Sequence, residues 1–290
     1  MIVATGHAFP DEDEATRSYF PSPWSGLIEA DIPAVRVGIM GTSLSSIDAA
    51  MAVVNQHGRF RRKGDDLRFD LDPASADLRI VMMSRSGVLP EADFYCPIPY
   101  EPLTIATAPA LAACLSTPAP LDAAFDLVRA EIIHADPAFA LKIGLGGLDV
   151  DSFADAYFAA REAADPFKWA RANLDEVEHN KAHKITVAWR YALLRMHEQV
   201  EEIVPDLSDD DRDRFDTGLK KVFVDNYAAV PSESIRRVLA LRDAGILSIM
   251  PLGEDYDMTR DGAETVIVHD NRIERFAVFI DARGQKSLST

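Results

Sequence analysis

The segment 35–50 constrains the fold more than any other part of the sequence, because an apolar run stops at a glycine and continues as a helical pattern. It reads VRVGIMGTSLSSIDAA. Gly41 permits a tight turn, and Ser43 and Ser46 occupy the second and third small positions of a spacing similar to GxGxxG. A strand, turn and helix of this kind present backbone N–H groups to a pyrophosphate. We therefore predict an α/β, Rossmann-like NAD(P)-binding sheet, with Gly41, Thr42, Ser43 and Ser46 at the cofactor.

An ordinary buried strand followed by a helix is the alternative for this segment, with Ser45 or Ser46 as the N-cap. The next apolar run, 78–83, bears on the choice because it is followed by Ser84 and Arg85. In a dinucleotide fold the end of the second strand meets the adenosine ribose, where an arginine suits a 2′-phosphate. Ser84 and Arg85 therefore predict NADP(H) rather than NAD(H), the alternative being a solvated arginine. The charged stretch 59–77 between the two runs is expected to be an exposed loop or hairpin.

Composition excludes several classes of protein. A net charge of −17 and a pI near 4.8 disfavour nucleic acid and anionic membrane as partners. No run approaches the roughly 18 apolar residues of a membrane span, and the N-terminus lacks the features of a signal peptide, so we expect a cytoplasmic protein. Its partner would be a small-molecule substrate of unknown identity, and a homo-oligomer stays open.

Metal chemistry has little support in the sequence. Cys96 and Cys114 have no metal-ligand spacing. His179 and His183 lie four residues apart on an expected helix, but no third ligand stands at a defined offset. We therefore predict no metal site and an exposed polar helix face at the histidines.

The middle of the chain changes from strand-like runs to apolar residues spaced three and four apart. Helices are expected at 121–134, 151–164, 166–204 (one helix or two), from 209 onward, and at 233–244. Further strands are expected at 246–250, 265–269 and 276–280. These patterns divide the chain into residues 1–30, a first part of the nucleotide-binding sheet at 31–100, a helical insertion at 101–245, and the remaining strands at 246–290.

The two ends of the chain have similar patterns. Residues 1–4 form an apolar run that leads into Thr5, Gly6 and His7, and residues 277–280 form another that leads into DARGQ, which contains Gly284. Both read as a strand followed by a glycine turn. The two strands could lie in one sheet that the intervening residues leave and rejoin.

The order ATGH, PSPW, GTSLSSID, SRSGVLP, a long helical stretch and FIDARGQ resembles the bacterial FAD-NAD(P)-binding family, which is distantly similar to flavin-containing monooxygenases. The resemblance implies an NADP-binding domain inserted into an FAD-binding domain. Members begin with a strand and a GxGxxG that hold FAD, and no such motif precedes residue 2. We therefore expect the inserted domain with short remnants of the FAD domain: a strand and linker at 1–30 and, within the remaining strands at 246–290, the return to the FAD domain.

For function, the resemblance implies a flavoprotein oxidoreductase, monooxygenase-like, in which NADPH passes a hydride to FAD. It places Thr5, Gly6 and Gly284 in the turns between the domains and His7 near their junction, while no catalytic residue is identified. The alternative is a catalytically inert nucleotide-binding or regulatory module that has lost the FAD half.

Overall fold

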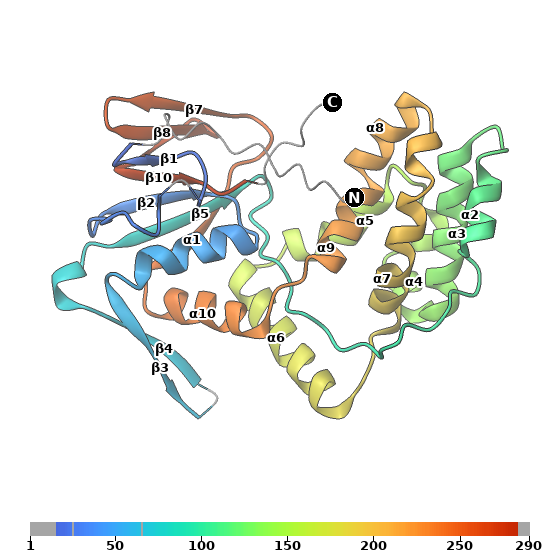
Figure 1. The fold of residues 1–290 in the computed structure, drawn as a ribbon, viewed down its shortest axis with the longest axis horizontal. Coiled ribbons are helices and arrows are strands. Elements are labelled where there is room, and N and C mark those ends of the chain that lie inside the picture. The colour runs from blue at the N-terminus through green and yellow to red at the C-terminus, as the bar shows by residue number, and fades with distance from the viewer. Residues whose placement is uncertain (1–15, 25, 65, 284–290) are drawn as a thin grey trace, which may run out of the picture. The chain divides into compact units, whose positions relative to one another are not determined.

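The computed structural model describes residues 16–24, 26–64 and 66–283, and the chain divides into two compact units (Figure 1). The first unit contains the residues up to 90, residues 166–171 and the residues from 233 onward. The second contains residues 91–165 and 172–232. The molecule is therefore a mixed α/β protein in which a helical unit is formed by residues between two parts of a sheet-containing unit.

A parallel sheet forms the core of the first unit, in the order β1-β10-β2-β5-β6. Its strands are β1 (Tyr19–Phe20), β2 (Arg36–Met40), β5 (Arg79–Ser84), β6 (Leu247–Pro251) and β10 (Val278–Asp281). Val37 in β2 pairs with Val278 on one side and Ile80 on the other. Because β2 is a central strand covered on both faces, it is a nearly continuous apolar run.

Different layers cover the two faces of this sheet (Figure 1). Helices α1 (Leu44–Val54) and α10 (Ser232–Asp243) lie on one face. The antiparallel strands β7 (Tyr256–Asp261), β8 (Glu264–His269) and β9 (Arg272–Phe276) lie on the other. Phe276 and Phe279 pack so closely against β2 that a Cβ on Gly38 would come within 2.9 Å of both rings. Gly38 therefore lets this second layer approach the parallel sheet.

The charged stretch 59–77, for which the sequence predicted an exposed loop or a hairpin, contains a hairpin. Strands β3 (Gly58–Lys63) and β4 (Asp66–Leu71) pair in antiparallel register. Arg61 forms an ion pair with Asp70 across the hairpin, and Arg62 forms one with Glu233 of α10. These arginines therefore pair with carboxylates of their own unit.

The strand predictions agree with the structure for β2, β5, β6 and β8. β7 and β9 were not predicted, and residues 276–280 belong to the end of β9 and to β10. One expectation needs correction: the run 277–280 was predicted to return to a separate flavin-binding sheet. Because β10 pairs with β2, it belongs to the sheet that carries the glycine turn. Its expected partner strand, 1–4, lies outside the described residues.

The second unit is helical and has its own apolar core. Its elements are α2 (Ala108–Cys114), α3 (Pro120–Ala135), α4 (Pro137–Lys142), α5 (Phe153–Glu162), most of α6 (Pro166–His183), α7 (Ala188–Glu201), α8 (Asp209–Thr217) and α9 (Leu219–Tyr227). The stretch 166–204 thus forms two helices, and Ser208 caps α8 by accepting from the N–H of Asp211. The predicted insertion, 101–245, also included α10, which lies in the first unit from Glu233 onward.

A cluster of buried charges ties the beginning of this unit to three of its helices. Glu91 lies between the guanidinium groups of Arg161 in α5 and Arg190 in α7, and Arg161 also contacts Asp225 in α9. Tyr157 donates its O–H to Asp225 at 2.9 Å. Burial raises the pKa of Tyr157 well above its usual range, so this phenol stays a neutral donor. The two arginines and two carboxylates balance in charge, which permits their burial.

No helix in the described ranges is long and apolar enough to cross a bilayer.

Candidate functional site

Polar residues gather at one edge of the parallel sheet, where its strands reach their carboxyl ends. Gly41 follows β2, Ser84 ends β5, and Asp281 ends β10. Adjacent register pairs join Met40 to Asp281 on one side and to Met83 on the other, so these strand ends lie in a row. In open parallel sheets this edge is where ligands bind. The three strands therefore bring most of the predicted cofactor residues together.

Gly41 has the backbone conformation that the sequence predicts. Its φ is +120°, which side chains rarely allow, and its N–H donates to Met83 O at 2.6 Å. A Cβ at this position would collide with the hydroxyl oxygen of Ser46 and lie 3.3 Å from Ala282 O. The prediction of a tight glycine turn after β2 is confirmed, and only glycine fits this turn.

Helix α1 begins directly after this turn with exposed N–H groups. Its N-cap is Ser43, rather than Ser45 or Ser46, and the Ser43 side chain makes no capping hydrogen bond. Ser43 O accepts from the N–H groups of Ser46 and Ile47. The N–H groups of Leu44 and Ser45 have no acceptor among the described residues. The first turn of α1 can therefore donate to an anion, and the helix dipole favours negative charge there.

The small side chains of this turn have different surroundings. Ser43 is exposed, whereas Ser46 is fully buried and its hydroxyl oxygen has no hydrogen-bond partner in the part of the chain that the structure describes. Because Ser46 lies against Gly41, its small size lets α1 start close to the strand. Thr42 is buried at the edge and donates its O–H to Ser84 Oγ at 3.2 Å. The small side chain of Ser46 therefore allows α1 and β2 to lie close together. The hydroxyl of Thr42 links the turn to β5.

At the end of β5, Ser84 and Arg85 take different parts in the local structure. Ser84 Oγ accepts from the N–H of Gly87 at 3.1 Å, so the hydroxyl shapes this turn. The Arg85 side chain is half exposed (53%) and forms an ion pair with Glu254 at 3.2 Å. Glu254 is itself 76% exposed, so the pair lies in solvent. Sequence reasoning identified Arg85 but not Glu254, because 169 residues separate them.

Arg283 is a second cation at this edge, and it was not among the predicted site residues. It forms an ion pair with Asp281 at 2.6 Å and donates to Tyr256 Oη at 3.3 Å. The hydrogen bond to Asp281 raises the pKa of Arg283 above its usual range, so it is charged at any physiological pH. The sequence signal was present in DARG, where only Gly284 was selected.

The remaining predicted site residues, Thr5, Gly6, His7 and Gly284, lie outside the described residues. Within the described ranges, no group of three or more His, Cys, Asp or Glu side chains is placed to hold a metal ion. His183 Nδ1 is hydrogen-bonded to the carbonyl oxygen of His179 at 2.8 Å. The two histidines therefore form a local contact along α6.

Comparison with known proteins gives two similarities. Residues 107–227 match the family described as YdhS-like middle domain. These residues fall mainly in the helical unit. Over 292 aligned residues the chain is 57% identical to the uncharacterized protein YdhS of Escherichia coli strain K12. The alignment covers 99% of this chain and 54% of that protein, so the chain spans about half the length of the curated relative that it matches.

Proposed function

We propose that the carboxyl edge of the parallel sheet binds NADP(H), and that the chain is the NADP(H)-binding portion of an FAD-dependent oxidoreductase. The observation that carries the proposal is the turn at Gly41, which leads from a central strand directly into the first N–H groups of α1. A pyrophosphate is the ligand that such a helix start accommodates best.

The order of the strands supports this assignment. Along the chain, β5 and β6 are added on one side of β2, and β10 and β1 lie on the other. Numbered from β2, this is the 3-2-1-4 order of dinucleotide-binding sheets, in which the ligand lies at the point where the order reverses. That point falls between β2 and β10, beside Gly41. Position and topology therefore agree on the same edge.

The residues at this edge fit the parts of the cofactor. Leu44 and Ser45 would donate their backbone N–H groups to the pyrophosphate, while Gly41 gives it room to approach the backbone. Arg85 would bind the 2′-phosphate of NADP(H) and donate to it in place of its exposed partner Glu254. An exposed ion pair of this kind stabilises by only about 0–1 kcal/mol, so exchanging it for a phosphate costs little. The guanidinium also matches phosphate geometry.

The oxidoreductase part of the proposal is supported by the sequence resemblance to two-dinucleotide flavoproteins. NADPH supplies a hydride to FAD in such proteins. This chain's contribution would be to fix the position of the nicotinamide nucleotide at the carboxyl edge. The residues that the resemblance places in the turns between the two domains (Thr5, Gly6 and Gly284) and near their junction (His7) belong to the terminal segments.

A direct test compares NADPH and NADH binding to three forms of the chain. Arg85→Ala should weaken NADPH binding roughly 10- to 100-fold and leave NADH nearly unchanged, because one charge-assisted hydrogen bond to the 2′-phosphate is lost. The matched control, Glu254→Gln, removes the same ion pair but keeps the guanidinium. It should bind NADPH as well as the parent chain or better. Titration of nucleotide fluorescence measures both cofactors.

Equal losses for NADPH and NADH in Arg85→Ala would contradict a 2′-phosphate contact. A second measurement tests the flavin part: the visible absorption spectrum after incubation with FAD and then NADPH. A flavin band that bleaches supports the oxidoreductase. Nucleotide binding without a flavin band would favour the inert nucleotide-binding module for these residues.

A further inference from the structure

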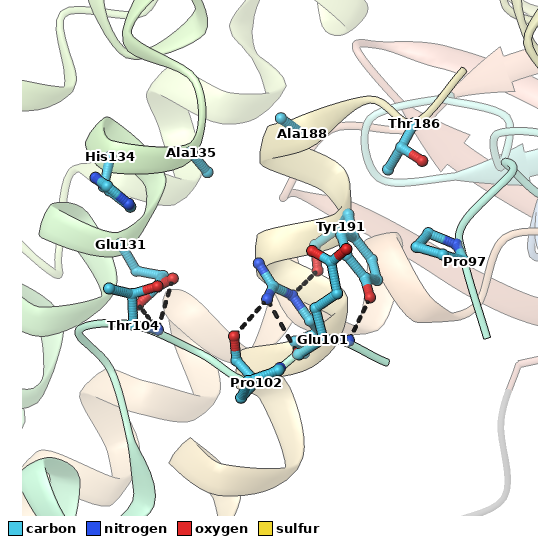
Figure 2. Close-up of a pocket in the computed structure, with 11 residues that line it drawn as sticks. Pro97, Glu101, Pro102, Thr104, Glu131, His134, Ala135, Thr186, Ala188 and Tyr191 are labelled. Atoms are coloured by element: carbon cyan, nitrogen blue, oxygen red, sulfur yellow. Dashed lines mark hydrogen bonds between the residues drawn. The ribbon is translucent and has the colours of Figure 1, made fainter. Parts of the chain in front are cut away.

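The helical unit contains a pocket of about 370 Å³ that is lined by both polar and apolar residues (Figure 2). Three parts of the chain form its walls: the segment 97–104, the last turns of α3, and the segment 186–195 at the start of α7. This volume is at the small end of the range for small-molecule sites, roughly 300–1,000 Å³. A metabolite of a few carbon atoms would fit, whereas a dinucleotide would not.

Arg195 brings a guanidinium group to this pocket, and its position is fixed on several sides. Its guanidinium carbon lies 4.4 Å from the centre of the Tyr191 ring, one helical turn earlier. Nη1 donates to the carbonyl oxygens of Glu101 at 3.1 Å and Pro102 at 3.0 Å. Nε donates to the backbone carbonyl oxygen of Tyr191 at 3.4 Å. Stacking and carbonyl contacts hold the guanidinium in one orientation, so little side-chain entropy is lost on binding a ligand.

Two donors in the pocket are left without an acceptor. Arg195 forms no ion pair with any carboxylate of the described residues, and its Nη2 has no acceptor among them. The hydroxyl oxygen of Tyr191 accepts from the N–H of Glu101 at 2.7 Å, which leaves its own O–H to donate (Figure 2). In a chain of net charge −17, an arginine without a carboxylate partner in a pocket points to a ligand of negative charge.

The opposite wall of the pocket holds a carboxylate that is already satisfied. Glu131 is buried, and its side chain accepts from the N–H group of Thr104 (Figure 2). It also accepts from the N–H groups of Ile105 and Ala106. Glu131 and Arg195 therefore hold the same stretch of chain, 101–106. Glu131 binds its backbone N–H groups, and Arg195 binds its backbone carbonyls. Because Glu131 and Arg195 both hold the wall formed by the segment 97–104, the free donors of Arg195 and Tyr191 are in position before a ligand binds.

We infer that this pocket binds a small organic carboxylate, with one carboxylate oxygen on Arg195 Nη2 and the other on the Tyr191 hydroxyl. A monoanion suits the pocket better than a phosphate dianion, because Glu101 and Glu131 supply negative charge opposite a single guanidinium. A structural role for Arg195 accounts for its contacts with three carbonyl oxygens but leaves Nη2 unused.

The experiment titrates the chain with benzoate and with benzamide, its neutral analogue of the same shape, by calorimetry and ligand-observed NMR. Benzoate should bind and benzamide should not. Arg195→Gln should weaken benzoate binding roughly tenfold or more, since a charge-assisted hydrogen bond is lost. Tyr191→Phe keeps the ring under Arg195 and should weaken binding by a smaller factor. Inorganic phosphate, titrated in parallel, should bind more weakly than benzoate.

Arg129→Gln is the matched control. Arg129 also lies over an aromatic ring, that of Phe125, and its Nη1 donates to a carbonyl, Leu148 O, but its Nη2 is paired with Asp126. Benzoate binding should be unchanged in this variant, and circular dichroism shows whether each variant is folded. If benzoate binds equally well to folded Arg195→Gln, or if benzamide binds as well as benzoate, the inference is wrong. Tighter binding of phosphate would overturn the choice of a carboxylate.

Discussion

Gly41 is subject to two independent constraints, one from its backbone and one from its surroundings. The positive φ of +120° would strain any residue with a side chain. The space where a Cβ would lie is filled by the Ser46 hydroxyl. Gly262, in the β7–β8 turn of the same unit, has only the first constraint: its φ is +64° and no atom lies near its Cβ position. Comparing substitutions at Gly41 and Gly262 therefore separates the effect of backbone strain from the effect of the steric clash.

Gly41→Ala should therefore lower the free energy of unfolding by roughly 1–3 kcal/mol and weaken nucleotide binding more than tenfold. The turn must change shape, which moves the first N–H groups of α1. Gly262→Ala should cost stability by about 1 kcal/mol and leave nucleotide binding unchanged. Urea unfolding and NADPH titration measure the two effects. Unchanged NADPH affinity in a folded Gly41→Ala chain would remove this turn from the proposed site.

At the residue scale, the sequence predicted those site residues whose role is local. Gly41 and Ser46 were found because a turn and a helix start have a fixed spacing along the chain. Arg283 and Glu254 were missed because their contacts depend on which strand ends are neighbours. No sequence signal identified Arg195 either, because Nη1 donates to backbone carbonyls of a distant segment, and any residue type can supply a backbone carbonyl.

At the element scale, long periodic segments were predictable and short or exposed ones were not. Helices α3, α5 and α10 have caps or prolines at their ends and apolar residues at helical spacing. Strand β7 escaped prediction because it reads YDMTRD and is largely exposed, so it lacks an apolar face. Strand β1 has only two residues. β10 was recognised as a strand, but its pairing with β2 depends on the whole sheet, which local patterns do not contain.

The buried charge cluster of the helical unit provides a prediction about how elements are held together. Glu91→Gln should lower the free energy of unfolding by roughly 3–5 kcal/mol, because Arg161 and Arg190 stay buried with one carboxylate fewer. Asp216→Asn removes an exposed pair with Lys220 in the same unit and should cost about 0.5 kcal/mol or less. Urea unfolding followed by circular dichroism compares them. Similar midpoints for the two variants would show that the buried cluster contributes no more than a surface pair.

At the scale of the whole molecule, the dominant property is the excess of negative charge. The chain carries 47 acidic residues against 30 lysines and arginines, so many carboxylates have no cation to pair with. Their mutual repulsion opposes the compact state. The exposed ion pairs act in the opposite direction, but each stabilises by only about 0–1 kcal/mol.

We therefore expect the midpoint of thermal unfolding to rise as sodium chloride is increased from about 10 mM to about 150 mM, over which the Debye length shortens from roughly 30 to 8 Å. Sucrose at equal osmolality is the control for effects unrelated to charge. Differential scanning fluorimetry without nucleotide is sufficient. A midpoint that falls with salt would mean that the surface ion pairs outweigh the general repulsion.

The place of β10 in the sheet has a consequence for synthesis on the ribosome. β10 leaves the ribosome after the other described strands, yet it fills the gap between β1 and β2, so Tyr19 meets its partner Phe279 only after all the other described strands have been made. Until then one edge of β2 carries unpaired N–H and C=O groups, a state that favours association with other chains. The helical unit, whose residues all precede Glu233, can meanwhile assemble its own core. Completion of the carboxyl edge of this sheet is thereby delayed until β10 has been made.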